Sequence, residues 1–353
     1  MVDRPDQVNR APSLDRTDAE GFTEDELVAT IRKILAGEGP GVRLGIGDDA
    51  ALVDVGDRLD ILTTDLLVED VHFRRDGMSP RDLGYKAIAV NVSDIAAMGG
   101  SPRYGLVSVA LPRDVAIGWV VELYGGVRDA SAEYAMTVVG GDTSLSDRIV
   151  LSVTVTGEVA KDGAVTRAGA RPGDRLVVTG ALGASAGGLR LAEADPEAVR
   201  SAVGSEWARE LVAAHVRPQA RVGEGQTLAQ AGATAMMDLS DGLAIDLGRL
   251  CRESAVGAAV ELARIPVAPG LAPLAGVLPI DPLQLALSGG EDYELLAVLP
   301  PHAVGPAISK IRERFGTPLT EVGEIRRGEG LVAVLEDGSE RPLEPTGWDH
   351  FGG

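Results

Sequence analysis

Six short motifs that combine acidic residues with glycine, serine or threonine hold the residues best suited to chemistry. They are residues 45–50 (GIGDDA), 63–65 (TTD), 91–94 (NVSD), 140–143 (GGDT), 238–242 (DLSDG) and 289–292 (GGED). Most lie at or near the end of an apolar run, where a carboxylate costs desolvation energy unless a cation compensates it. Carboxylate and hydroxyl oxygens are the ligands that magnesium prefers, and glycine lets a phosphate approach the backbone. The pattern therefore predicts a magnesium-dependent site for a polyphosphate.

The motifs supply more carboxylates than one magnesium ion needs. They are Asp48, Asp49, Asp65, Asp94, Asp142 and Asp238. If these residues converge, more than one ion is implied. Each motif taken alone is equally well explained as a turn, because glycine, aspartate and serine are common turn residues. Their joint occurrence favours a functional site over a set of unrelated turns.

Asp94 gives the clearest single signal among these residues. A helix expected from Ser79-Pro80 to about Met98 places it on the same face as Ala87 and Val90, at spacings of four and three residues. A negative charge in the C-terminal half of a helix is unfavourable. A surface aspartate near a helix end is the plain alternative, and we favour a role linked to a metal.

Familiar nucleotide-binding and nucleophile signatures are absent from the sequence. There is no P-loop, no protein-kinase set of motifs and no serine-nucleophile elbow. The four histidines lie far apart, and lysine occurs only at positions 33, 86, 161 and 310. We therefore expect metals and arginines to neutralise the phosphate charges.

The elements that must position these motifs form two α/β units. A capping box at Thr23 and Glu26 opens the first helix. Strands are expected at 42–55, 59–68, 136–139 and 148–158, with helices at 79–98 and 114–133. Beyond a turn at 161–163, strands are expected at 174–179, 233–238, 257–262, 293–299 and within 319–336, and helices at 183–194, 205–215, 218–231, 241–255, 283–288 and 302–315. We expect an α/β (α+β) fold with a disordered tail at 1–20, an N-terminal domain at 21–161 and a C-terminal α/β domain at 162–353.

Composition narrows the class of protein. A chain of 353 residues favours two domains, and 45% apolar residues with only 3% aromatics predict an aliphatic core. A net charge of −20 argues against nucleic acid or an anionic membrane as a partner. The single cysteine, Cys251, excludes an internal disulfide and fits a buried helix position. No segment has the length of a membrane span, and no signal peptide is recognised, so we expect a cytoplasmic protein.

The ordered set of motifs resembles the thiamine-monophosphate kinase family. The resemblance runs from about residue 22 to the end and includes the six motifs, His72-Phe73, the run YKAIAVNVSDIAAMG at 85–99, and WDHF at 348–351. The run SGGEDYEL at 288–295 is highly specific for this family. The family belongs to the superfamily of aminoimidazole ribonucleotide synthetase and selenophosphate synthetase.

Membership of that family would imply a fold, a reaction and a set of site residues. The N-terminal sheet would pair with its counterpart in a homodimer, and ATP would lie between the two domains. ATP and thiamine monophosphate would give ADP and thiamine diphosphate. The implied magnesium ligands are Asp49, Thr64, Asp65, Asp94, Asp142, Asp238 and Asp241, the implied ATP contacts are Gly141, Asp142, Arg167 and Ser240, and the implied thiamine contacts are His72, Glu291 and Trp348.

These implied contacts suit the chemistry of the substrates. A carboxylate suits the cationic thiamine, and an indole face offers cation–π attraction to an electron-poor heterocycle. The nucleophile would be an ionised phosphate oxygen of the substrate. No catalytic general base is then required, and we expect direct in-line transfer aided by several Mg²⁺ ions.

Other interpretations remain open at this point. Related enzymes of the superfamily share the acidic motifs, but selenophosphate synthetase usually carries a reactive cysteine or selenocysteine near its N-terminus, and hydrogenase-maturation relatives end in a functional cysteine. Both features are missing here. A non-catalytic sensor of thiamine phosphates or nucleotides on the same fold would have lost metal ligands, whereas every motif position here keeps an oxygen ligand. A purely structural or interaction protein, the other non-catalytic possibility, would not need carboxylates at these positions. Turnover is the property that separates the kinase from both non-catalytic alternatives.

Overall fold

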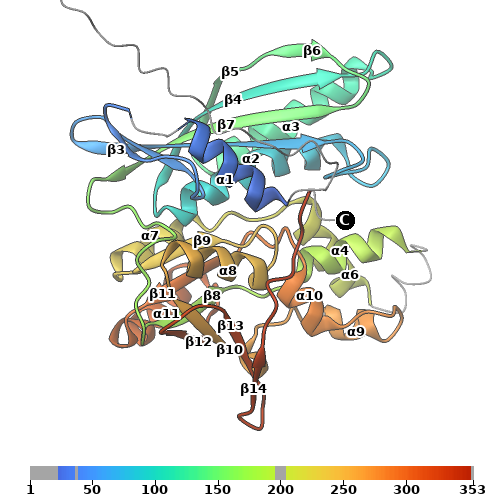
Figure 1. Ribbon diagram of the computed structural model, residues 1–353. Coiled ribbons are helices and arrows are strands. Elements are labelled where there is room, and N and C mark those ends of the chain that lie inside the picture. The colour runs from blue at the N-terminus through green and yellow to red at the C-terminus, as the bar shows by residue number, and fades with distance from the viewer. Residues whose placement is uncertain (1–22, 36–38, 195–203, 351–353) are drawn as a thin grey trace, which may run out of the picture.

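The fold divides the chain into two halves, each built around its own β-sheet (Figure 1). The structure is a computed structural model, and it describes residues 23–35, 39–194 and 204–350. The expected tail at 1–20 lies outside the described residues. Among the helices of the described segments, none combines the length and the apolar character needed to span a membrane.

The N-terminal half is a seven-stranded sheet covered on one face by two helices. Its strands are β1 (Val42–Leu44), β2 (Ala51–Asp54), β3 (Arg58–Val68), β4 (Ser101–Leu111), β5 (Thr137–Gly140), β6 (Thr143–Leu145) and β7 (Val150–Ala160), and its helices are α1 (Glu24–Leu35), α2 (Pro80–Ala97) and α3 (Ile117–Glu133). The strands run in the order β1-β2-β3-β7-β4-β5, and β6 pairs with β4. Helices α2 and α3 pack against each other, and α2 contacts both this sheet and the C-terminal half.

Helix α2 is the central helix of the molecule. The Ser79 side chain accepts a hydrogen bond from the backbone of Asp82, and Pro80 occupies the first turn. The helix is buried around most of its circumference, because the sheet, α3 and the C-terminal half all contact it. Its contact with α3 requires glycine: a Cβ at Gly84 would lie 2.0 Å from the carbonyl oxygen of Leu123.

The C-terminal half contains a second seven-stranded sheet with helices around it. Its strands are β8 (Arg175–Thr179), β9 (Ala235–Asp238), β10 (Gly257–Glu261), β11 (Leu295–Leu299), β12 (Leu319–Arg326), β13 (Leu331–Val334) and β14 (Glu340–Pro342). Its helices are α4 (Ala184–Glu193), α6 (Ser205–Val216), α7 (Val222–Gln230), α8 (Leu243–Glu253), η1 (Leu262–Arg264), α9 (Leu271–Ala275), α10 (Pro282–Ser288) and α11 (Pro301–Phe315). The strand order is β14-β13-β10-β12-β8-β11-β9. The turn at 161–163 falls between the last strand of the first sheet and the first strand of the second.

The two halves pack closely where α2 meets α7. A Cβ at Gly225 would lie 2.2 Å from the carbonyl oxygen of Ala96, and Ala97 joins an apolar cluster formed mostly by the C-terminal half. The Gln226 amide nitrogen donates to the carbonyl oxygen of Gly100 at 3.1 Å. This contact fixes the end of α2, and therefore Asp94, against β9.

Comparison with the sequence-based expectations confirms the α/β two-domain fold and locates the exceptions. The expected strand at 42–55 is two short strands separated by the GIGDDA loop, and the central strand β4 was not expected. The capping box of α1 is present, since Thr23 and Glu26 exchange hydrogen bonds. The apolar face of α1 is not buried, however: Ile31 and Ile34 are exposed. Ion pairs connect α1 to the C-terminal half, since Arg32 contacts Glu253 at 3.3 Å and Asp25 contacts Arg249 at 3.2 Å.

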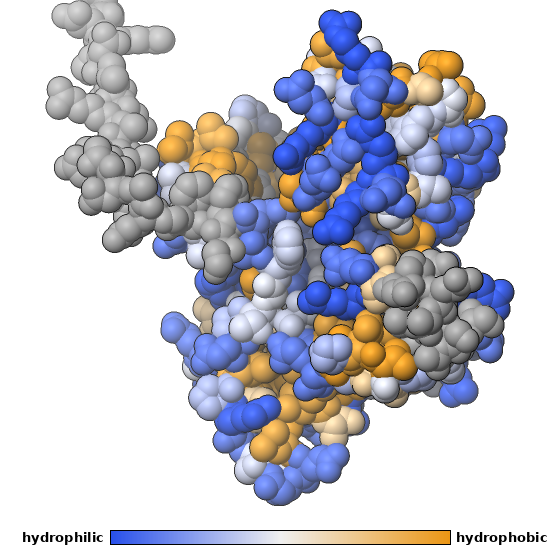
Figure 2. Space-filling view, turned by 90° about the vertical axis from the view of Figure 1, so that its right-hand side faces the viewer, coloured by the Kyte–Doolittle hydropathy of each residue, from blue (hydrophilic) through white to orange (hydrophobic). Residues whose placement is uncertain are grey.

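The surface agrees with the composition. Hydrophilic side chains cover much of the face seen in Figure 2, with hydrophobic areas between them. Cys251 is buried in α8, as expected for a small core residue.

Candidate active site

Three carboxylates from three separate segments meet between the two halves. Asp49 follows β1, Asp94 lies near the end of α2, and Asp238 ends β9. Their oxygens lie within 4.8 Å of one another. Burial first, and then repulsion between neighbouring carboxylates, raises the pKa of Asp94 and of Asp238 well above the usual range. Such a group of like charges favours the uptake of a cation or of protons.

One oxygen of this acidic cluster has no partner within the protein. The Asp49 side chain is fully buried, and its Oδ2 accepts no hydrogen bond in the described part of the chain. A buried carboxylate oxygen without a partner is costly. Three hard oxygen donors at this spacing, one of them unpaired, fit a magnesium ion.

Two hydroxyl groups contact the acidic cluster. Thr63 Oγ1 donates a short hydrogen bond to Asp94, and Ser93 Oγ donates to Oδ2 of Asp238 at 2.6 Å. Thr64, the residue that the family resemblance offers as a ligand, lies on the opposite face of β3. Its Oγ1 donates to the carbonyl oxygen of Val153 at 3.1 Å. The alternation of side chains along a strand explains the difference, because neighbouring residues point to opposite faces. The side-chain geometry therefore gives Thr63, and not Thr64, a place beside the carboxylates.

Arg167 supplies the positive charge beside the cluster. Its Nη2 lies 2.5 Å from Oδ1 of Asp49, and its backbone amide donates to Asp48 at 3.0 Å. Burial, followed by the charge of Asp49, nevertheless raises the pKa of Asp48 to about 7. One guanidinium is thus insufficient to compensate the two adjacent carboxylates.

A second acidic group surrounds Asp241 at the start of α8. Arg249 contacts Asp241 through a short ion pair and Asp246 at 3.0 Å. The same guanidinium reaches Asp25 of α1 at 3.2 Å. Burial, and then the charge of Asp241, raises the pKa of Asp65 to about 6, and the charge of Asp65 in turn raises the pKa of Asp94, so Asp65 interacts with both acidic groups.

The glycine-rich GGDT loop contributes backbone and not a buried carboxylate. A Cβ at Gly141 would lie 1.8 Å from the carbonyl oxygen of Val107, so the loop crosses β4 at a position that only glycine allows. Asp142 is exposed, and it is outside the group formed by Asp49, Asp94 and Asp238. The structure therefore brings three of the expected metal ligands into one cluster and leaves Asp142 outside it.

The expected thiamine contacts approach one another at the other end of the site. The ring centroids of His72 and His350 are 4.9 Å apart, and those of Trp348 and His350 are 5.8 Å apart. The Trp348 amide donates to the carbonyl oxygen of Asp241 at 3.0 Å, which fixes the C-terminal segment on the DLSDG loop. Trp348 is half exposed, so its ring is accessible to a ligand.

Glu291 is held by two basic residues that the sequence analysis did not assign to the site. Lys86 Nζ lies 2.6 Å from Oε1 and His215 Nδ1 lies 3.2 Å from Oε2. Burial alone would raise the pKa of Glu291, but the charges of Lys86 and His215 outweigh it and lower this pKa to about 2. The amide of Glu291 donates to the carbonyl oxygen of Ser240 at 2.7 Å, so the GGED and DLSDG loops are joined directly.

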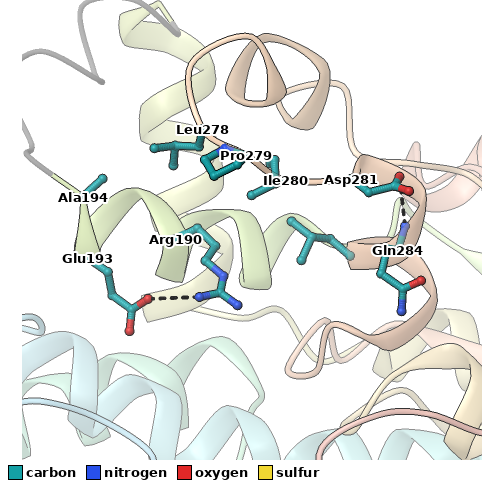
Figure 3. Close-up of a pocket in the computed structure, with 9 residues that line it drawn as sticks. Arg190, Glu193, Ala194, Leu278, Pro279, Ile280, Asp281 and Gln284 are labelled. Atoms are coloured by element: carbon teal, nitrogen blue, oxygen red, sulfur yellow. Dashed lines mark hydrogen bonds and ion pairs between the residues drawn. The ribbon is translucent and has the colours of Figure 1, made fainter.

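A separate cavity of about 490 Å³ lies beside α4 and α10 (Figure 3). Leu278, Pro279 and Ile280 form its apolar wall, and Arg190 and Gln284 flank it. None of the expected site residues lines this cavity. The acidic cluster is thus identified by its side-chain contacts and not by an enclosed volume.

Comparisons with known proteins agree with this geometry. Residues 47–159 match the family model of the AIR synthase related protein N-terminal domain, and residues 171–336 match the corresponding C-terminal domain. The chain is 36% identical over 316 residues to the thiamine-monophosphate kinase of Bacillus subtilis (strain 168), covering 88% of this chain and 94% of that protein. The chain belongs to the thiamine-monophosphate kinase family. The family member from Aquifex aeolicus (strain VF5) is 38% identical over 306 residues, covering 87% of this chain and 92% of that protein.

Solved structures of the family have the same fold. The structure of AaThiL complexed with AMPPCP and TMP has a TM-score of 0.80 and 36% identity, and covers 93% of this chain and 97% of that chain. The hydrogenase maturation protein HypE of E. coli, at 20% identity and a TM-score of 0.68, shares the fold alone.

Several residues of the site escaped the sequence analysis for identifiable reasons. His215 contacts Glu291 from α6, although the four histidines lie far apart in the sequence and gave no sign of this contact. Lys86 compensates a carboxylate of the protein, Glu291, a role that the sequence analysis did not give to any lysine. One signal was available for Lys86: it is one of only four lysines and follows Tyr85 in a nearly continuous apolar run. The spacing of Asp246 and Arg249 by three residues was a comparable signal for the second acidic group.

Proposed function

We propose that this protein transfers the γ-phosphoryl group of ATP to thiamine monophosphate, giving ADP and thiamine diphosphate, the last step in making that cofactor. The observation that carries the proposal is the meeting of Asp49, Asp94 and Asp238 within 4.8 Å beside Arg167. Family membership supports the choice of substrates, and a family structure has AMPPCP and TMP bound. Because ATP is made available in the cytoplasm, the proposal includes a cytoplasmic location.

Magnesium dependence follows from the acidic cluster. Asp49, Asp94 and Asp238 would hold one magnesium ion. The charge of Asp241 raises the pKa of Asp65, so these two carboxylates interact, and we propose that they hold a further ion. Thr64 and Asp142 remain proposed ligands whose side chains lie outside this cluster. Bound magnesium supplies the neutralisation of phosphate charge that transfer between two anions requires.

One set of residues near the acidic cluster is proposed to contact ATP, and another set is proposed to contact the acceptor. Gly141, Asp142, Arg167 and Ser240 are the proposed ATP contacts. Arg167 has a guanidinium that suits bidentate binding of phosphate, and Gly141 lets the backbone come close. On binding ATP, Arg167 would exchange part of its contact with Asp49 for phosphate oxygens.

The acceptor end of the site is proposed to consist of His72, Glu291 and Trp348. The carboxylate of Glu291 suits the cationic thiamine moiety, and the exposed indole of Trp348 offers it a π face. The acceptor phosphate would then be directed towards the acidic cluster, since Trp348 is bonded to the backbone of Asp241.

The proposed chemical step is direct in-line transfer. A phosphate oxygen of the acceptor attacks the γ-phosphorus of ATP, the bond to the β-phosphate oxygen breaks, and ADP leaves with the bonding electrons. The attacking oxygen is already ionised at neutral pH, so no side chain has to remove a proton. The histidine–carboxylate pair of His215 and Glu291 does not alter this, because both groups are engaged with each other.

A homodimer is part of the proposal. The face of the N-terminal sheet away from α2 and α3 exposes large apolar side chains. They are Leu62, Leu66, Tyr104 and Leu106, which are 40–51% exposed. Adjacent apolar residues on a sheet face are a common basis for association, and the family resemblance names this sheet as the dimer interface.

The test is ADP release in a coupled assay with ATP, magnesium and thiamine monophosphate, compared with free thiamine as acceptor. We expect turnover that requires thiamine monophosphate and magnesium and that is lost in Asp49→Ala. A folded protein that binds both ligands without turnover would overturn the kinase assignment and favour the sensor.

A further inference from the structure

Lys86 is a fully buried cation with no evident use in phosphoryl transfer. Its side chain is 1% exposed, and it projects from α2, in the N-terminal half. In the described part of the chain its ammonium forms an ion pair with Oε1 of Glu291, at 2.6 Å across the boundary between the two halves. A buried ammonium is tolerated only when an anion compensates it. Lys86 therefore depends on Glu291 for its burial.

Glu291 is held equally firmly from its other side. His215, which is 8% exposed, places Nδ1 3.2 Å from Oε2, and Ser185 Oγ lies 3.1 Å from the same ring nitrogen. The backbone is constrained as well, since Glu291 has φ 66° and Tyr293 has φ 51°, in the left-handed region that non-glycine residues rarely adopt. Unusual backbone of this kind persists where the surroundings enforce it, and it occurs preferentially at functional sites.

The side chains of Lys86, His215 and Glu291 differ in the fraction of their surface that solvent can reach. Lys86 and His215 are almost inaccessible, whereas the Glu291 side chain is 26% exposed. The two basic residues lie against separate oxygens of the carboxylate, Lys86 at Oε1 and His215 at Oε2. Of the three side chains, that of Glu291 is therefore the one most open to a ligand.

We propose that Lys86 and His215 are positioning residues that hold Glu291 as a carboxylate in one orientation for the cationic moiety of the acceptor. This inference rests on the proposed function. Without Lys86, burial would favour the protonated form of Glu291, and a neutral carboxylic acid attracts a cation poorly. The pair thus selects for a positively charged acceptor without contacting it.

The charged and titratable groups around Glu291 come from four segments. Lys86 lies on α2, His215 on α6, His72 in the segment before α2, and Tyr293 in the same loop. Only Lys86 and His215 lower the pKa of Glu291, to about 2, so the carboxylate stays ionised throughout the range of an activity assay. Loss of Lys86 would move this pKa upwards, towards that range.

The decisive variant is Lys86→Met, with Lys310→Met as the matched control because Lys310 is a lysine on the exposed side of α11. We expect Lys86→Met to raise KM for thiamine monophosphate about tenfold to a hundredfold, the loss typical of a charged hydrogen bond. KM for ATP should change less than about twofold, because the ATP contacts are unaltered. The increase should be larger near pH 6 than near pH 8, because removing the Lys86 charge raises the pKa of Glu291 and protonation of its carboxylate increases towards lower pH.

A purely structural role would give a different result. KM values for both substrates that change together, or an increase that is equal at every pH, would overturn the positioning role while leaving the kinase assignment intact. If Lys86→Met does not fold, His215→Leu provides the same comparison of KM values, and an unchanged KM for thiamine monophosphate would overturn the inference.

Calorimetric binding separates this inference from the proposed function. If the wild-type protein binds thiamine monophosphate without turning it over, weaker binding by Lys86→Met supports the positioning role although the kinase assignment fails. Equal binding by both proteins overturns the role. Absence of binding by the wild-type protein overturns both.

Discussion

Ser93 and Asp238, from opposite halves of the molecule, share a buried hydrogen bond of 2.6 Å. Ser93 precedes Asp94 in the NVSD motif, and Asp238 opens the DLSDG motif. Two similar short motifs that lie far apart in the chain are therefore in direct contact. The contact sets the separation of Asp94 and Asp238, so the acidic cluster depends on the correct docking of the two halves.

Asp94→Asn should remove activity and stabilise the metal-free protein. Repulsion within the cluster raises the pKa of Asp94, and the neutral amide removes that repulsion. We expect activity to fall more than about a hundredfold, as for loss of a metal ligand. In chelator we expect Tm to rise, by about 2 °C or more for each kcal/mol that is added to the free energy of unfolding. Differential scanning calorimetry with and without EDTA measures the second effect. Asp162→Asn, at an exposed turn, is the control, and a lower Tm for Asp94→Asn in chelator would contradict the expectation.

The stability of the metal-free protein should decrease as the pH rises. The pKa values of Asp48 and Asp65 are raised to about 7 and about 6, so the folded state binds these protons more tightly than the unfolded chain. The resulting stabilisation is present at low pH and is lost as the pH rises from about 4, the unfolded value, through the folded values. Magnesium should abolish this loss by occupying the carboxylates. Urea unfolding at several pH values, in EDTA and in magnesium, measures it, and identical pH profiles would refute it.

Thr63→Val and Thr64→Val form a matched pair on adjacent positions of β3. Thr63 donates to Asp94, whereas Thr64 donates to the carbonyl oxygen of Val153 on the other face. We expect Thr63→Val to lower kcat/KM about tenfold through loss of a hydrogen bond to a charged group, and Thr64→Val to change it by less than about threefold. Steady-state kinetics decide between them. A greater loss for Thr64→Val would favour the ligand role that the family resemblance gives to Thr64.

Leu66→Glu should dissociate the proposed homodimer. Leu66 is 51% exposed on the outer face of β3, where a buried carboxylate in an interface would be unpaired. Sedimentation velocity should show a monomer for this variant and a dimer for the wild-type protein. Leu189→Glu, at a 40% exposed position on α4, should stay dimeric. A monomeric wild-type protein would remove the homodimer from the proposal.

The sequence was sufficient for the order of most elements and for the carboxylates of the main cluster. Strong helix and turn signals, such as Ser79-Pro80 and the glycines after Met98, depend only on neighbouring residues, and they mark the ends of α2 correctly. β4 was missed because it begins with Ser-Pro-Arg-Tyr and lacks a clear apolar alternation at its start. The later run LVSVAL at 106–111 does carry a strand signal, and the strand pairs with β7 and β5 over its length.

The basic partners of Glu291 could not be found from local patterns. Lys86 lies in a helix that is buried on nearly all sides, so helical periodicity does not indicate which neighbour its ammonium meets. His215 is on α6, and its contact with Glu291 depends on the left-handed backbone at residue 291. Contacts between distant segments of this kind are set by tertiary packing.

The return of the C-terminal segment to the DLSDG loop makes this segment a tether between the two halves. His350 contacts His72 of the N-terminal half, and Trp348 binds the backbone of Asp241 in the C-terminal half. A motion of either half would therefore be transmitted directly to the rings that form the proposed surface for the acceptor.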